Sequence, residues 1–265
     1  MRTIYIGNLR GGVGKTLSTV NLAHEFSELG YKVLIIDNDK QGNASAMFKR
    51  HDYEHDGVDK VMTDRHVDMN LIIQHTENEN IDIVAANMKL LSANRSVLLD
   101  FERPQQTRFK DALEQVKDKY DYCLIDNAPD INISTINALV CADDVIIPVT
   151  IDEFSVEGLE ELKEQIDQVK EAQNPGLNFI GCFITQYDKT NECEEYGEQE
   201  IIRKGFELFE TKIHKTPKMK PSTFAKMPIS VYSKRCKASK DYKDFVQEYL
   251  KKVEAIKKNW WEVEK

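Results

Sequence analysis

Residues 8–17 read Asn8-Leu9-Arg10-Gly11-Gly12-Val13-Gly14-Lys15-Thr16-Leu17, between an apolar run at residues 3–7 and an amphipathic stretch at residues 15–29. A strand, a glycine-rich turn and a helix in this order form a phosphate-binding loop, because glycines let backbone N–H groups and the helix N-terminus point at an anion. In such a loop Lys15 neutralises the phosphate and the Thr16 hydroxyl binds Mg²⁺. The stretch therefore predicts a nucleotide site, although Leu9 stands where the strict Walker pattern has glycine. The alternative is a glycine-rich turn with an incidental Gly-Lys-Thr.

The rest of the chain alternates short β-branched runs with longer amphipathic stretches. This alternation predicts an α/β fold in which a mostly parallel twisted sheet is flanked by helices on both faces. We expect strands at residues 3–7, 32–37, 81–85, 122–126, 145–149 and 178–184. We expect helices at residues 15–29, 88–99, 107–119, 133–140, 156–172, 197–209 and 237–258, and an irregular excursion at residues 50–80.

Composition indicates one cytoplasmic globular domain over residues 1–265. The chain is 41% hydrophobic and 31% charged, which suffices for one sizeable core. It contains no apolar run of about 18 residues and no secretory signal pattern, so we expect no membrane span. Its five cysteines form no C-x-x-C pair, which argues against a disulfide framework and against a zinc finger.

Charge is unevenly distributed along the chain. The net charge is −9, yet residues 211–258 are basic, and residues 211–240 contain nine lysine or arginine side chains and no acidic one. Such a stretch is typical of a surface that binds a polyanion. The candidate DNA contacts are Lys212, Lys218, Lys220, Lys234, Arg235 and Lys237. The alternative is a solvated lysine-rich surface.

Four blocks, in order along the chain, resemble the deviant-Walker ATPases of the ParA/MinD type, whose phosphate loop reads Lys-Gly-Gly-x-Gly-Lys-Thr. Residues 37–43 are similar to the family's Asp-x-Asp-Pro-Gln-Gly-Asn segment, with Lys40 in place of proline. Residues 120–129 resemble its Walker B strand and Asp-x-x-Pro exit. Residues 142–149 and 157–159, with Tyr232, Lys237 and Tyr242, match the partition branch. The resemblance covers nearly the whole chain and implies a P-loop NTPase fold of the deviant Walker A type.

The resemblance also implies ATP and Mg²⁺ as cofactors. We expect the phosphates on Gly11, Gly12, Val13, Gly14, Lys15, Thr16 and Leu17, and the adenine near Thr185, Lys215 and Pro217. Leu17 replaces the family's second threonine. Mg²⁺ is expected on Thr16, Asp37 and Asp126, and the catalytic residues are expected to be Lys15, Asp39 and Arg10, with Asp39 orienting the attacking water.

Arg10 is a departure from the family pattern. The family has at this position a signature lysine that reaches the phosphates of the partner in a nucleotide-sandwich dimer. An arginine keeps the positive charge and adds a planar fork suited to phosphate, so Arg10 is expected to act as an arginine finger supplied in trans. The alternative is a local salt bridge.

These observations together predict a ParA-type partition ATPase. It is expected to form a homodimer with ATP, to bind DNA nonspecifically near the nucleoid, and to hydrolyse ATP when a ParB-like cargo-bound protein stimulates it. One alternative is a MinD-like membrane-positioning ATPase, with Trp260 and Trp261 at a bilayer surface, although docking of the last helix on the core is favoured. Others are an ATP-dependent amidase-coupled biosynthetic synthase and a switch that binds ATP without hydrolysing it.

Overall fold

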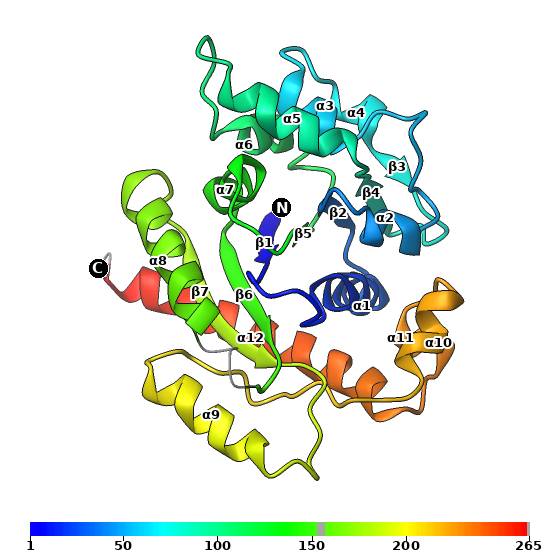
Figure 1. The fold of residues 1–265 in the computed structure, drawn as a ribbon, viewed down its shortest axis with the longest axis vertical. Helices are drawn as coiled ribbons and strands as arrows, with labels where there is room; N and C mark the ends of the chain where they lie inside the picture. The colour runs from blue at the N-terminus through cyan, green and yellow to red at the C-terminus, as the bar shows by residue number, and fades with distance from the viewer. Residues whose placement is uncertain (153–156, 264–265) are drawn as a thin grey trace.

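Seven strands form one sheet in the described part of the chain, residues 1–152 and 157–263 of this computed structural model (Figure 1). They are β1 (Arg2–Ile6), β2 (Val33–Asn38), β3 (Gln74–His75), β4 (Ile81–Val84), β5 (Tyr122–Asn127), β6 (Asp144–Val149) and β7 (Asn178–Ile184). Their order is β3-β4-β2-β5-β1-β6-β7, and every neighbouring pair is parallel except β3 with β4. The predicted α/β fold is confirmed, and each of the six predicted strands is present to within one residue at either end.

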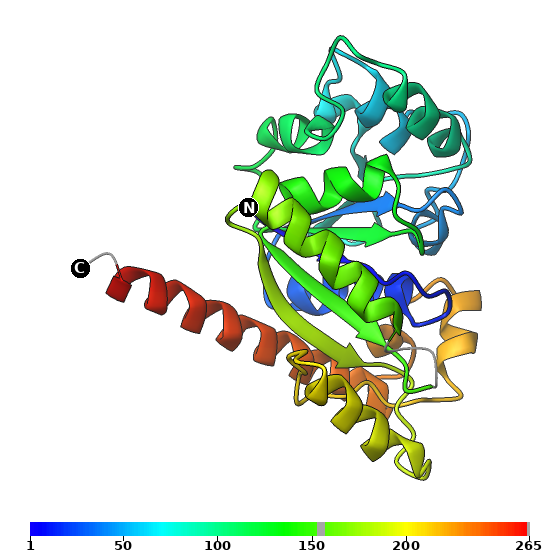
Figure 2. The same ribbon diagram turned by 60° about the vertical axis from the view of Figure 1, so that its left-hand side comes forward.

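Successive residues of the central strands pack into separate cores on the two faces of the sheet. Ile4 and Ile6 share one core with Phe26 of α1 (Lys15–Glu28) and Tyr249 of α12 (Lys237–Val263). Tyr5 belongs to the other core, which is covered by α5 (Lys89–Leu98), α6 (Arg108–Glu114), α7 (Ile133–Cys141) and α8 (Glu157–Ala172). Side chains of a strand alternate between faces, so a sheet buried on both faces needs the continuous apolar runs seen in the sequence. Figure 2 shows the long α12, in red, running past the sheet.

The prediction of an irregular excursion at residues 50–80 is wrong. This stretch contains α3 (Val58–Thr63), α4 (Met69–Ile72) and β3, and Val58, Met62 and Met69 are fully buried. Helices this short are not stable alone, and α3 is held by packing against α5 and α6. Each of these helices is therefore too short to show a helical periodicity that could be recognised in the sequence.

The helix predicted at residues 197–209 is also misplaced, because α9 spans Cys193–Arg203. Gly205 adopts a left-handed φ of 83°, which ends the helical turn. The chain then runs beside β7, where the Cys182 N–H donates to the Glu207 carbonyl at 2.7 Å and the Phe209 N–H donates to the Cys182 carbonyl at 2.8 Å. Pairing with β7 and burial of Phe209 thus override helical propensity.

Other helix boundaries differ more modestly. The helix predicted at residues 107–119 ends at Glu114, and the last helix continues beyond residue 258 to Val263. Residue 156, the predicted start of α8, lies outside the described residues, as do the side chains of Trp260 and Trp261. Besides α3 and α4, three more short helices were not predicted, namely α2 (Asn43–Met47), α10 (Met219–Phe224) and α11 (Ile229–Tyr232).

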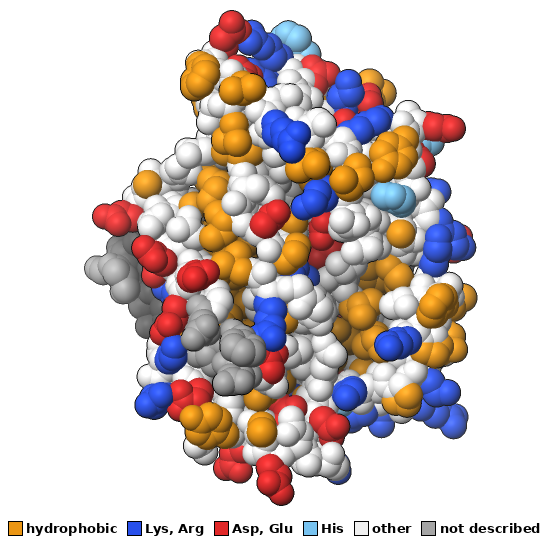
Figure 3. Space-filling view, in the orientation of Figure 1, with side chains coloured by type: hydrophobic (Ala, Val, Ile, Leu, Met, Phe, Trp, Pro, Cys, Tyr) orange, Lys and Arg blue, Asp and Glu red, His pale blue; other side chains and the backbone are white. Residues whose placement is uncertain are grey.

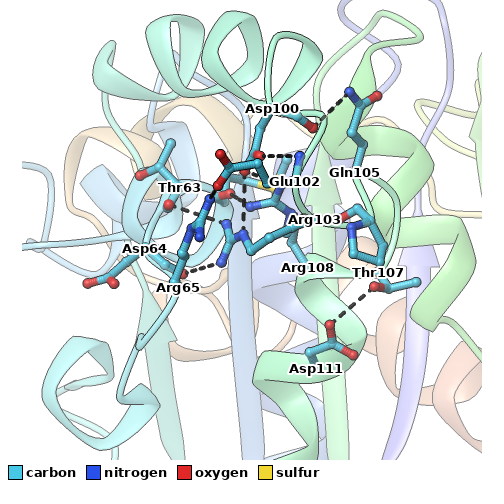
Figure 4. A network of polar contacts seen from close by, with 12 residues as sticks. Thr63, Asp64, Arg65, Asp100, Glu102, Arg103, Gln105, Thr107, Arg108 and Asp111 are labelled. Carbon is cyan, nitrogen blue, oxygen red and sulfur yellow. Dashed lines mark hydrogen bonds and ion pairs between the residues drawn. The ribbon is translucent and has the colours of Figure 1, made fainter.

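Arginine side chains fix the outer helical layer around α3 and α6 (Figure 4). Arg108 is 5% exposed and donates to the Asp100 carboxylate at 2.8 Å and to the Met62 carbonyl at 3.2 Å. Arg103 donates to the Asp64 carbonyl at 3.0 Å. These bonds hold the segment between α5 and α6 while leaving Phe101 86% exposed.

Candidate nucleotide-binding site

The turn between β1 and α1 leaves the N-terminus of α1 open to an anion. Gly12 and Gly14 have left-handed φ angles of 80° and 85°, which side chains other than glycine rarely adopt. Gly14 is the N-cap of α1, and no side chain caps the helix and no acidic residue lies in its first turn. The first N–H groups of a helix have no partner within it and carry a partial positive charge. This end of α1 therefore suits a phosphate group.

Lys15 lies over this turn. Its ammonium Nζ donates to the Arg10 carbonyl at 2.8 Å, and the residue is only 7% exposed. Burial lowers the pKa of Lys15, while the charges of Asp126 and Asp39 raise it. A buried ammonium held among carboxylates is suited to neutralising a phosphate, as the sequence predicts.

Two fully buried carboxylates meet beside the turn, because Asp37 of β2 and Asp126 of β5 lie opposite each other in the parallel register. Asp126 Oδ1 accepts from the Thr19 hydroxyl at 3.4 Å, while Asp126 Oδ2 has no hydrogen-bond partner among the described residues. Burial and the charge of Asp37 raise the pKa of Asp126 well above its ordinary value, and the Thr16 hydroxyl opposes this rise. An orphaned buried carboxylate oxygen beside a hydroxyl is a suitable place for a hydrated Mg²⁺ ion.

Asp37 organises the loop that follows β2. Its Oδ2 accepts from the backbone N–H of Ser45 at 2.7 Å and from the Ser45 hydroxyl at 2.6 Å, and its Oδ1 accepts from the Asp39 N–H at 3.2 Å. Burial raises the pKa of Asp37 to about 6 despite these bonds. Ser45 was missed by the sequence analysis, since nothing in its spacing marks it as a partner of Asp37.

Asp39 is 8% exposed and stands at the start of the same loop. Its Oδ1 accepts from the Gln41 N–H at 2.9 Å. Its charge raises the pKa of both Lys15 and Asp126, so Asp39 lies close enough to both side chains to act on them through space. The structure thus brings together the residues expected to hold the phosphates and the metal and to orient water.

Arg10 lies at the rim of this group and forms an ion pair with Asp152, each side chain being 35% exposed. Its backbone N–H donates to Asn8 Oδ1 at 2.9 Å. Within one chain the local ion pair that the sequence analysis left open is therefore present. The role of Arg10 toward a second chain stays a prediction.

The loop after β7 is hydrogen-bonded to the backbone of the phosphate turn. The Thr185 hydroxyl donates to the Val13 carbonyl at 2.8 Å, and Gln186 Nε2 donates to the Gly12 carbonyl at 2.8 Å. Thr185 is 3% exposed, so its side chain braces the turn instead of facing solvent. Lys215 and Pro217 are exposed nearby, where the Lys215 N–H donates to the Tyr187 carbonyl at 2.9 Å.

The six candidate DNA contacts divide into two groups. Lys218, Lys220, Lys234 and Arg235 are exposed, and Lys237 is exposed while its Nζ lies 2.6 Å from Asp241 Oδ1. Lys212, by contrast, forms an ion pair with Glu198, and its Nζ lies 4.8 Å from the centre of the Tyr187 ring. The structure therefore separates Lys212, which is paired and only 24% exposed, from Lys237, which is paired but 57% exposed.

Comparison with known proteins agrees with this geometry. Residues 1–179 match the AAA_31 family, described as an AAA domain. The chain is similar to the sporulation initiation inhibitor protein Soj of Bacillus subtilis, with 33% identity over 93% of this chain and 97% of Soj. It is 31% identical to the chromosome-partitioning ATPase Soj of Treponema pallidum, over 94% of this chain and 97% of that protein.

A solved structure shares the fold. Cobyrinic acid a,c-diamide synthase of Mycobacterium smegmatis, with a bound ATP analogue and magnesium, superimposes with a TM-score of 0.84 at 22% identity over 96% of each chain. Within the described residues, none of the helices has the length and apolar content needed to span a bilayer. The phosphate turn, the family match and the two relatives above 30% identity show that the chain belongs to the ParA-type family of partition ATPases.

Proposed function

We propose that this chain is an ATP-dependent DNA partition ATPase. It binds ATP and Mg²⁺, forms a homodimer, binds DNA without reading its sequence, and hydrolyses ATP to ADP and phosphate when a ParB-like cargo-bound protein stimulates it. It acts in the cytoplasm on the nucleoid. The name of the Treponema pallidum relative supports the partition role, since that protein is a chromosome-partitioning ATPase.

One observation carries the proposal, namely the uncapped N-terminus of α1 beside the unpartnered Oδ2 of buried Asp126. Lys15 and the backbone N–H groups of the turn would bind the terminal phosphates, while Thr16, Asp37 and Asp126 would hold the metal. When bound, Mg²⁺ neutralises charge on the phosphate oxygens. Asp39 accepts a hydrogen bond from the attacking water and orients it. Phosphoryl transfer depends mainly on such positioning and charge neutralisation.

The exposed basic residues supply the DNA contact. Lys218, Lys220, Lys234 and Arg235 neutralise backbone phosphates, which requires no base-specific hydrogen bond. Their combined contribution falls as salt rises, because binding releases counterions from DNA. Arg10 contributes to the dimer by reaching the phosphates of the second chain, for which it has to leave Asp152.

The test measures retention of a random-sequence DNA duplex with ADP and with ATP at several salt concentrations, beside ATP turnover. We expect retention with ATP, weak retention with ADP, and a steep loss with salt. Lys15→Ala should abolish ATP binding in calorimetry and with it the ATP-dependent retention. Asp39→Ala should keep ATP affinity and give DNA-bound dimers that persist, because turnover is lost.

Two results oppose the proposal. Unchanged nucleotide affinity of Lys15→Ala would refute the assignment of the phosphate turn. ATP turnover that requires a small carboxylate substrate and ignores DNA would favour the biosynthetic alternative.

A further inference from the structure

The surface formed by residues 218–234, which we name the α10–α11 surface, combines exposed apolar side chains with positive charge. Phe224 is 89% exposed, and Met227, Val231 and Tyr232 are 43%, 45% and 39% exposed. Lys218, Lys220, Lys226 and Lys234 are exposed among them, and the surrounding residues 211–240 contain no acidic side chain. Figure 3 shows hydrophobic and basic side chains gathered over α10 and α11.

This surface is firmly anchored, so the exposure of Phe224 does not reflect a loose segment. Ile229 is fully buried, and its N–H donates to Asn21 Oδ1 at 2.7 Å. The Asn21 amide in turn donates to the Leu17 carbonyl at 2.7 Å. Ser222 is 1% exposed, and its hydroxyl donates to the Met219 carbonyl at 2.7 Å. Phe224 therefore lies outward on an anchored segment, beside the other exposed apolar side chains of this surface.

The hydrogen bond between Ile229 and Asn21 also joins the α10–α11 surface to the helix that borders the candidate nucleotide site. Asn21 belongs to α1, whose N-terminal end faces the phosphate turn. A cavity of about 350 Å³ separates this end of α1 from α10 and is lined on one side by Thr16 and Leu17 and on the other by Thr223 and Lys226. A buried hydrogen bond therefore links α11 directly to the helix that begins at the phosphate turn.

We propose that the α10–α11 surface contacts DNA through both kinds of side chain, with Phe224 as an apolar wedge against the bases and the lysines on the flanking phosphates. This inference rests on the proposed function, of which it specifies the binding surface. Apolar side chains of DNA-bending proteins insert between base steps in a similar way, without hydrogen bonds to the base edges. The contact adds an affinity component that does not depend on salt.

Two other occupants fit the observations less well. A second copy of this chain across a two-fold axis would bring the same lysines face to face, while Glu28 near Lys234 and Glu77 near Lys226 line separate cavities beside the surface. An anionic bilayer favours a long helix with one continuous apolar face. Here α10 has six residues and α11 has four, and lysines stand between the apolar side chains.

The experiment measures the DNA association constant of the full chain with ATP at four salt concentrations. Phe224→Ala should lower the association constant by about tenfold at every salt concentration. The plot of log K against log salt should then run parallel to that of the wild type, because a lost stacking contact releases no counterions. Lys220→Ala should instead reduce the slope of log K against log salt by about 0.9. Phe101→Ala is the matched control, since this residue is 86% exposed but lies between α5 and α6, and it should change nothing.

Each other outcome has a definite meaning. DNA affinity of Phe224→Ala within twofold of the wild type, with the wild type retained on DNA, overturns this inference and leaves the proposed function standing. A wild-type chain that fails to bind DNA at low salt overturns both. Loss of binding to phosphatidylserine vesicles in Phe224→Ala, with DNA binding intact, assigns the surface to a membrane. A loss of dimer mass in light scattering assigns it to a second copy.

Discussion

Asp37 and Asp126 show at the scale of single residues how the fold brings two carboxylates together at the proposed cation site. Their carboxylates are fully buried on adjacent strands, and burial raises the pKa of both. The folded state therefore favours the protonated forms. Without metal, the stability that Asp37 contributes is present below about pH 4 and is lost as the pH rises through about 6. A bound divalent cation removes this penalty, so metal binding and proton release are coupled.

Asp126→Asn should stabilise the metal-free chain at pH 8, because it removes one of two neighbouring buried charges. We expect a gain on the order of 1–3 kcal/mol in the free energy of unfolding and a weaker decline between pH 4 and 7. Thermal unfolding across this pH range, without and with Mg²⁺, measures both effects. The variant should also lose the stabilisation by Mg²⁺.

Asp130→Asn serves as the control for this prediction, because its side chain is 42% exposed and should leave the pH dependence unchanged. An Asp126→Asn chain that melts below the wild type at pH 8 would mean that Asp126 is stabilised in its charged form. The assignment of a cation to its Oδ2 would then lose its main support.

At the scale of elements, one buried carboxylate joins three segments that are far apart in the sequence. Asp144 of β6 is fully buried and accepts from Arg2 Nε at 2.5 Å and Nη2 at 2.7 Å, both from β1. The Tyr249 hydroxyl of α12 donates to the same carboxylate at 2.5 Å. Removing one partner of a buried ion pair leaves an uncompensated charge, which costs far more than an exposed pair is worth. Asp144 thereby fixes α12 on the sheet.

Arg2→Ala should lower the free energy of unfolding by about 3–5 kcal/mol, and Tyr249→Phe by about 1–2 kcal/mol. Urea unfolding monitored by circular dichroism measures both changes. The two effects should not add in the double variant, because both residues act on Asp144. Arg65→Ala is the matched control, since Arg65 pairs with Glu102 at the surface, and its loss should leave the free energy of unfolding nearly unchanged. An Arg2→Ala effect of similar size to this control contradicts the prediction.

At the scale of the whole molecule, the proposed homodimer needs Arg10 to exchange Asp152 for phosphates of a second chain. The ion pair is 35% exposed on both sides, so its loss costs little. The ion pair thus opposes dimerisation only weakly. The larger part of the energy for dimer formation has to come from the contacts with nucleotide.

Arg10→Ala should abolish ATP-dependent dimers while leaving ATP affinity within about twofold, because the guanidinium acts on the partner's phosphates. Asp152→Asn should permit dimers at a concentration up to about fivefold lower, since the ion pair of Arg10 with Asp152 no longer competes with the partner's phosphates. Light scattering over a concentration series with ATP measures both. Dimers of Arg10→Ala that match those of the wild type would assign Arg10 only its local ion pair.

The sequence by itself determined the elements whose signals are local. The six long strands are continuous apolar runs, and the phosphate turn needs its glycines at the left-handed positions 12 and 14. Lys15, Asp37, Asp39 and Asp126 follow strands or precede a helix at fixed short distances, so their convergence at one sheet edge follows from parallel topology. These parts of the site were therefore predictable from a single chain.

Tertiary structure alone decided which polar groups find partners across long separations. Ser45 reaches Asp37, Tyr249 reaches Asp144, and Lys212 pairs with Glu198 instead of facing solvent. It also decided that residues 58–72 form short helices and that residues 206–209 lie along β7. The physical reason is that a buried donor or charge takes its partner from whatever the packed core places beside it. Local propensity carries no information about that neighbour.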